Sequence, residues 1–113
     1  MHEMSLAEGI VQIVEKTARD HNAIRVRSVV LELGALSHVE QDALRFCFDA
    51  VTRGTVADGA VLQIDTPAGR AWCMPCGDSV ALARLGDACP KCGSYQLQVT
   101  DGEQMKVKEV EVA

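Results

Sequence analysis

Two closely spaced pairs of cysteines constrain the fold of this chain more than any other feature of its sequence. Each pair has C-x-x-C spacing, twelve residues separate the pairs, and the four members are Cys73, Cys76, Cys89 and Cys92. Two such pairs can turn four thiolates toward one ion, which is the pattern of a tetrahedral zinc site with bonds of about 2.3 Å. We therefore predict a zinc site at these four residues.

A cysteine at every ligand position predicts a structural site, because a closed site leaves no position for a substrate. A glycine follows each pair, at Gly77 and Gly93, and glycine permits the backbone conformation that turns both thiolates toward the ion. Between Arg70 and Thr100 the apolar residues are too few for an independent core. Metal binding is expected to supply the folding free energy of this segment instead.

Three alternatives to a zinc site exist at these cysteines. Disulfides are disfavoured because the N-terminus lacks the basic leader of a signal peptide, so we expect the cytoplasm, where thiols stay reduced. A thioredoxin-like redox motif has one C-x-x-C in a βαβ setting, and here there are two pairs without that setting. Iron also suits four thiolates, and the C-P-x-C-G of the second pair resembles a rubredoxin knuckle, but zinc is preferred.

Two capping boxes predict two amphipathic helices in the rest of the chain. Ser5 with Glu8 opens the first, Ser37 with Glu40 opens the second, and Gly54 is expected to end the second. The predicted core-facing residues are Leu6, Ile10, Ile13, Val14 and Thr17 in the first helix and Val39, Ala43, Leu44, Cys47, Phe48 and Val51 in the second.

Segments rich in β-branched residues predict three strands, at 24–33, 60–66 and 103–112. In the last segment the apolar residues change parity, which predicts a β-bulge near Lys108 and Glu109. The most economical arrangement is an α+β fold: two helices on a three-stranded antiparallel sheet, with an inserted zinc-ribbon-like module that holds the four cysteines. The predicted domains are 1–67 together with 102–113, which form the α+β domain, and 68–101, the zinc-binding domain.

The overall composition excludes several classes of function. The net charge of −5 and 11 scattered basic residues argue against nucleic acid as a partner, since phosphates need clustered Lys and Arg. No apolar run approaches the ~20 residues that cross a bilayer, so we predict no membrane span. With no phosphate-binding loop, nucleophile elbow or open zinc site, the chain is not predicted to be an enzyme.

The N-terminal Met1-His2-Glu3 is a second candidate metal site. The α-amine, the His2 backbone nitrogen and the His2 imidazole can form fused chelate rings, and planar nitrogen coordination selects Ni(II) or Cu(II) over zinc. The Glu3 backbone nitrogen or another side chain could fill the remaining position. A terminal histidine is also common as a plain solvated residue. His21 fits the end of a helix, and His38 is either a surface residue or a spare ligand.

Together these features resemble the HypA/HybF family, the nickel metallochaperones of [NiFe]-hydrogenase maturation. The resemblance runs along the whole chain. The residues that carry it are Met1-His2-Glu3-Met4-Ser5-Leu6, Leu36-Ser37-His38-Val39-Glu40, Phe46-Cys47-Phe48 and the two cysteine pairs.

The resemblance implies that Met1, through its amine, His2 and Glu3 bind nickel, with Glu40 an acidic neighbour of that site. It implies structural zinc at Cys73, Cys76, Cys89 and Cys92. The ion would pass to a hydrogenase large-subunit precursor with the help of a HypB-type GTPase, and a homodimer is left open. Some relatives use a zinc-domain histidine in transfer, and this chain has none between the cysteine pairs.

Two other functions remain as alternatives. The first is a zinc-ribbon adaptor for protein or nucleic acid, in which the terminal Met-His is accidental. The second is a rubredoxin-like electron carrier, which would be coloured because iron thiolates absorb visible light.

Overall fold

The computed structural model describes residues 2–113 and contains two compact units. The helical unit comprises Met1–Leu31, His38–Ile64 and Val107–Ala113, and the cysteine unit comprises Glu32–Ser37 and Asp65–Lys106. The elements, in order, are α1 (Glu3–Asp20), β1 (Val26–Leu33), α2 (Gln41–Thr52), β2 (Val61–Asp65), β3 (Arg70–Cys73), β4 (Asp78–Ala81), β5 (Leu97–Asp101) and β6 (Met105–Val112). Neither helix of the described chain has the length and apolarity that a membrane span requires.

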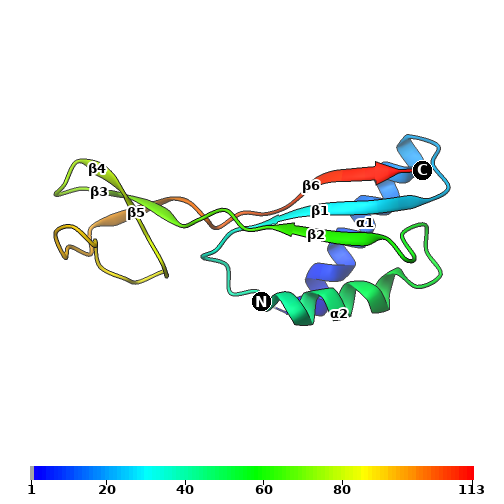
Figure 1. Ribbon diagram of the computed structural model, residues 1–113, viewed down its shortest axis with the longest axis horizontal. Coiled ribbons are helices and arrows are strands. Elements are labelled where there is room, and N and C mark those ends of the chain that lie inside the picture. Colours follow the sequence, from blue (N-terminus) through cyan, green and yellow to red (C-terminus); the bar gives the residue numbers. More distant parts are fainter. Residues whose placement is uncertain (1) are drawn as a thin grey trace. The chain divides into compact units, whose positions relative to one another are not determined.

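The first sheet has the strand order β2-β1-β6, and both helices lie on one side of it (Figure 1). The second sheet, with the order β4-β3-β5, is formed by strands that lie between β2 and β6 in the sequence. The predicted fold class is therefore confirmed: an α+β fold with two helices, a three-stranded sheet and an inserted cysteine module.

The directions of the strands refine this prediction. The Val26 N–H donates to the Val56 carbonyl over 2.9 Å, and the Ala35 N–H donates to the Pro67 carbonyl over 2.8 Å. From the first bond to the second, the residue number rises on both strands, from Val26 to Ala35 and from Val56 to Pro67. β1 and β2 therefore run parallel, as their arrows do in Figure 1. A strand–helix–strand connection through α2 gives this direction. Within the first sheet, the predicted antiparallel direction holds for β1 and β6 only.

The pairing of β1 with β6 contains an irregularity that both strands share. The Ala113 N–H donates to the Arg25 carbonyl over 3.0 Å, and the Gly34 N–H donates to the Gln104 carbonyl over 2.7 Å. The two intervals, Arg25 to Gly34 and Gln104 to Ala113, are equal, so neither strand has a net extra residue between these bonds. Both intervals are also odd, whereas hydrogen-bonded pairs recur every second residue in a regular antiparallel ladder. The change of face predicted near Lys108 and Glu109 agrees with the burial along β6, where Val107, Val110 and Val112 are half-buried and both residues between Val107 and Val110 are exposed.

Both helices begin at residues other than those predicted. α1 starts at Glu3 with His2 as its N-cap residue and has no side-chain cap, so Ser5 lies inside the helix. α2 starts after Glu40, whose own Oε1 accepts the Asp42 N–H at 3.0 Å. A carboxylate at the N-cap position satisfies a free helical N–H as a serine hydroxyl does, and this moves the start of α2 past the predicted Ser37 cap.

The core of the helical unit lies between the two helices and the first sheet. The buried residues of the helices are Ala7, Ile10, Val11, Val14 and Ala18 in α1 and Leu44, Phe48 and Thr52 in α2. The predicted stripe of α1 was wrong at Ile13, which is 52% exposed. Ala7 and Ala18 are buried instead, so the buried face of α1 is rotated toward them. Cys47 is half-buried rather than fully buried.

The cysteine unit has a small core of its own, which corrects the expectation that this segment lacks one. It consists of Leu36, Ala71, Cys73, Val80, Leu82 and Cys89, with Leu97 and Val99 packed against it. Leu36 comes from the segment between β1 and α2, far from the cysteines in the sequence. Two of the six buried members are cysteines of the predicted zinc site, so the predicted ligands form part of this core.

Three glycines in the cysteine unit allow chain segments to pack at backbone distance. A Cβ atom on Gly34 would lie 2.0 Å from the Gly102 carbonyl oxygen, and one on Gly102 would lie 2.6 Å from the Gly69 Cα. Gly102 also has a φ of 101°, in the region that side chains avoid. The Leu36 N–H donates to the Gly102 carbonyl over 2.8 Å, so this contact holds Leu36 in the small core.

Candidate metal centre

The four predicted zinc ligands come together in one cluster. The Sγ atoms of Cys73, Cys76, Cys89 and Cys92 all lie within 4.8 Å of one another. Two of the sulfur–sulfur distances are 3.6 Å, between Cys73 and Cys92, and 3.9 Å, between Cys76 and Cys89. A tetrahedron with bonds of about 2.3 Å has edges of about 3.8 Å. The cluster therefore fits a tetrahedral thiolate site such as that of zinc. Disulfide bonds, at about 2.05 Å, are much shorter.

The backbone of each cysteine pair turns in the same way. The Gly77 N–H donates to the Cys73 carbonyl over 2.9 Å, and the Gly93 N–H donates to the Cys89 carbonyl over 2.8 Å. Gly77 has a φ of 61° and Gly93 a φ of 76°. These positive values are the reason for glycine after each pair, and they confirm the conformational role predicted for both glycines.

A strand fixes one of the ligands, and burial in the small core fixes a second. Cys73 ends β3, the central strand of the second sheet, and its Cα is paired with Asp78 of β4 and Leu97 of β5. Cys73 and Cys89 are buried in the small core. Cys76 and Cys92 lie in the exposed turns. A metal would thus be bound by two buried cysteines of the core, Cys73 and Cys89, and by two exposed cysteines of the turns, Cys76 and Cys92.

Hydrogen bonds within and beside the cluster shift the pKa values of its thiols in different directions. The Lys91 N–H donates to Cys89 Sγ over 3.4 Å. Burial raises the pKa of the Cys89 thiol, but hydrogen bonds with the N–H groups of Cys92 and Lys91 and with the sulfurs of Cys73 and Cys92 together lower it to about 7. In contrast, hydrogen bonds with the sulfurs of Cys92 and Cys73 raise the pKa of Cys76 to about 12. The hydrogen bonds of the cluster thus favour the thiolate of Cys89 and the protonated thiol of Cys76.

Lys91 is a residue of this site that the sequence interpretation missed. Its Nζ lies 3.0 Å from Asp78 Oδ2, and this hydrogen bond raises the pKa of Lys91 and lowers that of Asp78. The ion pair joins the second cysteine pair to β4. Lys91 was visible in the sequence between Cys89 and Cys92, but its partner depends on the register of β3 and β4.

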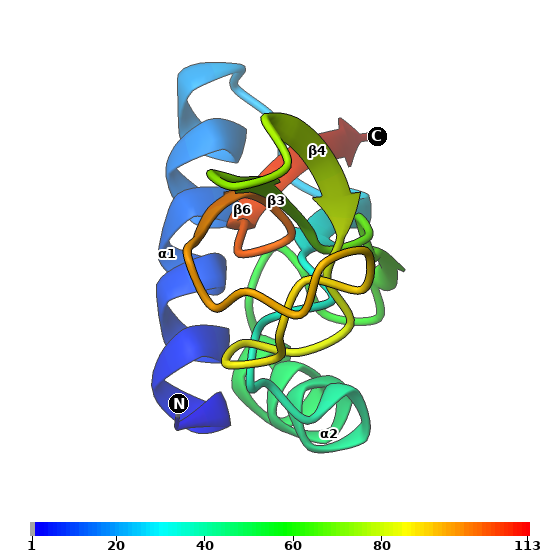
Figure 2. The same ribbon diagram turned by 90° about the vertical axis from the view of Figure 1, so that its left-hand side faces the viewer.

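The predicted nickel ligands lie at the other candidate site. Met1 falls outside the described residues. His2 is exposed at the start of α1. Glu3 Oε2 accepts the Glu40 N–H at 3.3 Å, and this bond lowers the pKa of the Glu3 carboxyl. The first turn of α1 therefore lies beside the start of α2, as Figures 1 and 2 show.

The other histidines of the described chain take no part in a metal cluster. The His21 Nδ1 lies 2.9 Å from the Thr17 carbonyl oxygen at the end of α1, in agreement with its predicted place. His38 is exposed. Within residues 2–113, the cysteines are the one group of three or more His, Cys, Asp or Glu side chains with ligand atoms close enough for an ion.

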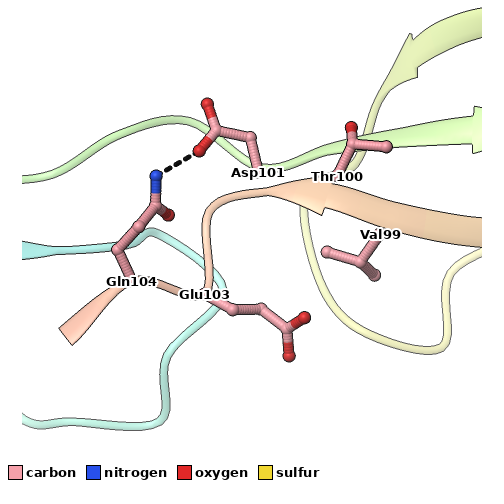
Figure 3. A pocket seen from close by; sticks show the side chains of 5 residues that line it. All are labelled: Val99, Thr100, Asp101, Glu103 and Gln104. Carbon is pink, nitrogen blue, oxygen red and sulfur yellow. Dashed lines mark hydrogen bonds between the residues drawn. The ribbon is translucent and has the colours of Figure 1, made fainter.

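A small cavity in the cysteine unit is lined by polar groups that hold the turn at Gly102. It measures about 220 Å³ and is lined by Val99, Thr100, Asp101, Glu103 and Gln104. The Gln104 amide points at the Asp101 carboxylate and donates to it (Figure 3). The Gly102 N–H donates to both Asp101 Oδ1, at 3.0 Å, and Gln104 Oε1, at 2.8 Å. These polar groups satisfy one another and fix the turn at Gly102.

Comparison with known proteins identifies the family. The family model described as "Hydrogenase/urease nickel incorporation, metallochaperone, hypA" matches residues 1–112. The hydrogenase maturation factors HypA of Dechloromonas aromatica (strain RCB) and Bradyrhizobium sp. (strain ORS 278) are 55% and 59% identical over 112 residues, with 99% of each chain covered.

Two solved structures share the fold. The solution structure of the Ni metallochaperone HypA from Helicobacter pylori has a TM-score of 0.72 at 24% identity and covers 99% of this chain and 97% of its own. A second structure, "Solution structure of HypA protein", has a TM-score of 0.74 at 23% identity, with 100% and 97% covered. Given the family match along the sequence, this chain belongs to the HypA family of nickel-incorporation metallochaperones.

Proposed function

We propose that this chain binds Ni(II) through the Met1 amine, His2 and Glu3, and delivers it to the large-subunit precursor of a [NiFe]-hydrogenase. The family consists of metallochaperones for hydrogenase maturation rather than enzymes, and nickel is the cargo. The proposal assigns structural zinc to Cys73 and the other three cysteines of the cluster.

The start of α1 is the observation that carries the proposal. The first helical hydrogen bond runs from the Leu6 N–H to the His2 carbonyl, at 3.2 Å. The N–H groups of His2 and Glu3 precede it, and the first N–H groups of an α-helix have no acceptor within the helix. Their nitrogens can lose a proton and bind nickel without breaking a helical bond. The positive end of the helix dipole also favours the negative charge of a deprotonated amide.

A resident zinc ion would serve the structure of the cysteine unit. Zinc is proposed over iron because zinc has no redox chemistry and a closed site of four thiolates is its usual structural arrangement. In domain terms, we assign nickel binding to residues 1–67 and 102–113 and zinc binding to 68–101. Two units with separate cores support a division of this kind, but the cysteine unit has wider bounds than the proposed zinc domain, namely Glu32–Ser37 and Asp65–Lys106.

Delivery is proposed to occur by ligand exchange. His2, the residue before α1, is exposed, so a receiving protein can reach the metal there. A HypB-type GTPase is proposed as the partner that assists release, and the cysteines of the precursor are proposed as the acceptors. The cytoplasm is proposed as the compartment because the zinc cluster needs reduced thiols.

The test is calorimetric titration of nickel into zinc-loaded protein with its native N-terminus, comparing wild type with His2→Ala. We expect about one nickel per chain in the wild type and loss of that binding in the variant, with zinc retained in both. His21→Ala is the matched control, since it removes an exposed imidazole at the opposite end of α1 and should bind nickel as the wild type does. Equal binding by wild type and His2→Ala would show that the terminal Met-His is accidental and would leave a zinc-ribbon adaptor.

A further inference from the structure

β6 lies at one edge of the first sheet, and within residues 2–113 no strand is paired with its outer side (Figure 1). The strand order β2-β1-β6 gives it a single neighbour, β1. At eight residues, Met105–Val112, β6 is as long as β1, and no proline interrupts it. An edge strand of this length offers a row of N–H and C=O groups to another strand.

The hydrogen bonds of β6 to its neighbour show which backbone groups point outward. The Ala113 N–H and the Gln104 carbonyl are both directed toward β1, at the two ends of β6. Successive residues of a strand direct their N–H and C=O groups to alternate sides. Counted inward from both ends, this alternation directs to the outer edge the backbone groups of Met105, Val107, Val110 and Val112.

The sequence of β6 is complementary to its own reverse. When two copies of β6 are paired antiparallel with Lys108 opposite Glu109, every apolar residue meets an apolar residue and every basic residue meets an acidic one. A two-fold axis between the strands repeats each pair, as a symmetric dimer of identical chains requires. The four kinds of pair are Met105 with Val112, Lys106 with Glu111, Val107 with Val110 and Lys108 with Glu109.

This register also brings the outward backbone groups together. Val107 of one copy meets Val110 of the other, and both direct their N–H and C=O groups to the outer edge. Each such pair can therefore exchange two hydrogen bonds, as in a regular antiparallel ladder. Both valines are half-buried, so pairing also removes more of their apolar surface from water.

The charges of β1 extend the complementarity of β6. Glu111 Oε1 lies 3.9 Å from Arg27 Nη1, and Lys106 Nζ lies 3.9 Å from Glu32 Oε1. With Glu111 beside Lys106 of the second copy, the row across four strands reads Arg27, Glu111, Lys106, Glu32. The sign of the charge alternates at every step of this row. Opposite charges on neighbouring strands stabilise a sheet, and like charges destabilise it.

We infer that a second copy of this chain binds at the outer edge of β6, in the register that pairs Lys108 with Glu109. The two three-stranded sheets then form one sheet of six strands, and the helices of both copies lie on the same face of it. Charged residues on an edge strand can also serve only to prevent pairing. That role needs charges but no particular order, whereas in β6 the order places every charge opposite its complement. The inference involves no metal ligand, so it stands apart from the proposed function.

The experiment measures self-association of the full zinc-loaded chain by sedimentation velocity over a wide range of protein concentration. Lys108→Glu and Glu109→Lys each place like charges opposite one another in both symmetry-related pairs. Each variant alone should associate about tenfold more weakly than the wild type, or weaker still. An equimolar mixture of the two variants restores opposite charges in both pairs and should associate within about threefold of the wild type. Glu8→Lys makes the same charge change on an exposed residue of α1 and should associate as the wild type does.

Hydrogen exchange gives a second readout, which reports on the register. The amides of Val107 and Val110 form hydrogen bonds only in the dimer, so their exchange should slow as the protein concentration rises. In Lys108→Glu alone this dependence on concentration should disappear, and mixing with Glu109→Lys should restore it. Recovery on mixing also shows that both variants are folded.

Three outcomes would overturn the inference. A wild type that stays monomeric at every concentration would mean that the charges of β6 only protect the edge. Equal association by the wild type and both single variants would place the contact between copies on another surface. Weaker association of both variants without recovery in the mixture would exclude the register that pairs Lys108 with Glu109.

Discussion

Glu3 and Glu40 show how a single contact gives a side chain an environment that composition does not reveal. The Glu40 N–H lowers the pKa of the Glu3 carboxyl below its ordinary value of 4.5. A lowered pKa means that the hydrogen bond favours the charged form, so the bond is complete above 4.5 and is lost as pH falls through the lower value. Since this hydrogen bond lies at the surface, the effect is local rather than a large part of the stability.

We therefore expect the Glu40 amide resonance of the metal-free protein to titrate with a midpoint below 4.5. The measurement is a series of two-dimensional spectra between about pH 6 and pH 2.5. In Glu3→Ala the same resonance should lose this transition. A midpoint above 4.5 in the wild type would mean that the contact does not favour the carboxylate.

Gly102 is a residue whose replacement should harm the cysteine unit. A Cβ atom there would meet the Gly69 Cα at 2.6 Å, and the φ of 101° is strained for any side chain. We expect Gly102→Ala to lower the free energy of unfolding by about 1–3 kcal/mol. Gly9→Ala is the control, since Gly9 lies in α1 with nothing within 4 Å of the added atom. It should be neutral or stabilising in urea unfolding, because alanine favours helix.

At the scale of the elements, the buried face of α1 differs from the one that its apolar stripe predicts. The sequence pattern predicts Ile13 and Val14 on the same face, but Ile13 is 52% exposed and Val14 is fully buried. We expect Val14→Ala to cost roughly 1–3 kcal/mol in the free energy of unfolding. Ile13→Ala should change it by less than about 0.5 kcal/mol. Equal losses in thermal unfolding would show that the face of α1 is not the one described.

Other features of the elements show where sequence reasoning succeeds and where it cannot. The four cysteines and their following glycines were predictable because a metal site depends on short, local spacing. Helix starts were harder, since the cap of α2 is its own Glu40 rather than a serine. The direction of β2 and the place of Leu36 were beyond local patterns, because both depend on which distant segments pack together. The partner of Glu3, thirty-seven residues away, was hidden for the same reason.

At the scale of the whole molecule, the two units should depend on metal to different degrees. The helical unit buries residues such as Leu44, Phe48 and Leu31, and none of these is a proposed ligand. The small core of the cysteine unit includes Cys73 and Cys89 and therefore loses cohesion when the metal leaves.

We expect a zinc chelator to abolish protection from hydrogen exchange in β3, β4 and β5 while amides of α1 and α2 stay protected. Refilling with zinc should restore the protection. Cys73→Ala should reproduce the loss without any chelator. Unfolding of α1 and α2 under the same treatment would mean that the helical unit cannot stand without zinc.

The place of β6 in the first sheet has a consequence for how the chain is made. β6 is the last strand in the sequence, and its partner β1 is the first. During synthesis on the ribosome, the whole cysteine segment emerges before β6 can pair with β1. The cysteines are thus available to a metal before the first sheet is complete. If the cluster binds zinc as proposed, capture of the ion can precede closure of the sheet, and a nascent chain that fails to acquire it reaches that final step without the ligand bonds of its middle segment.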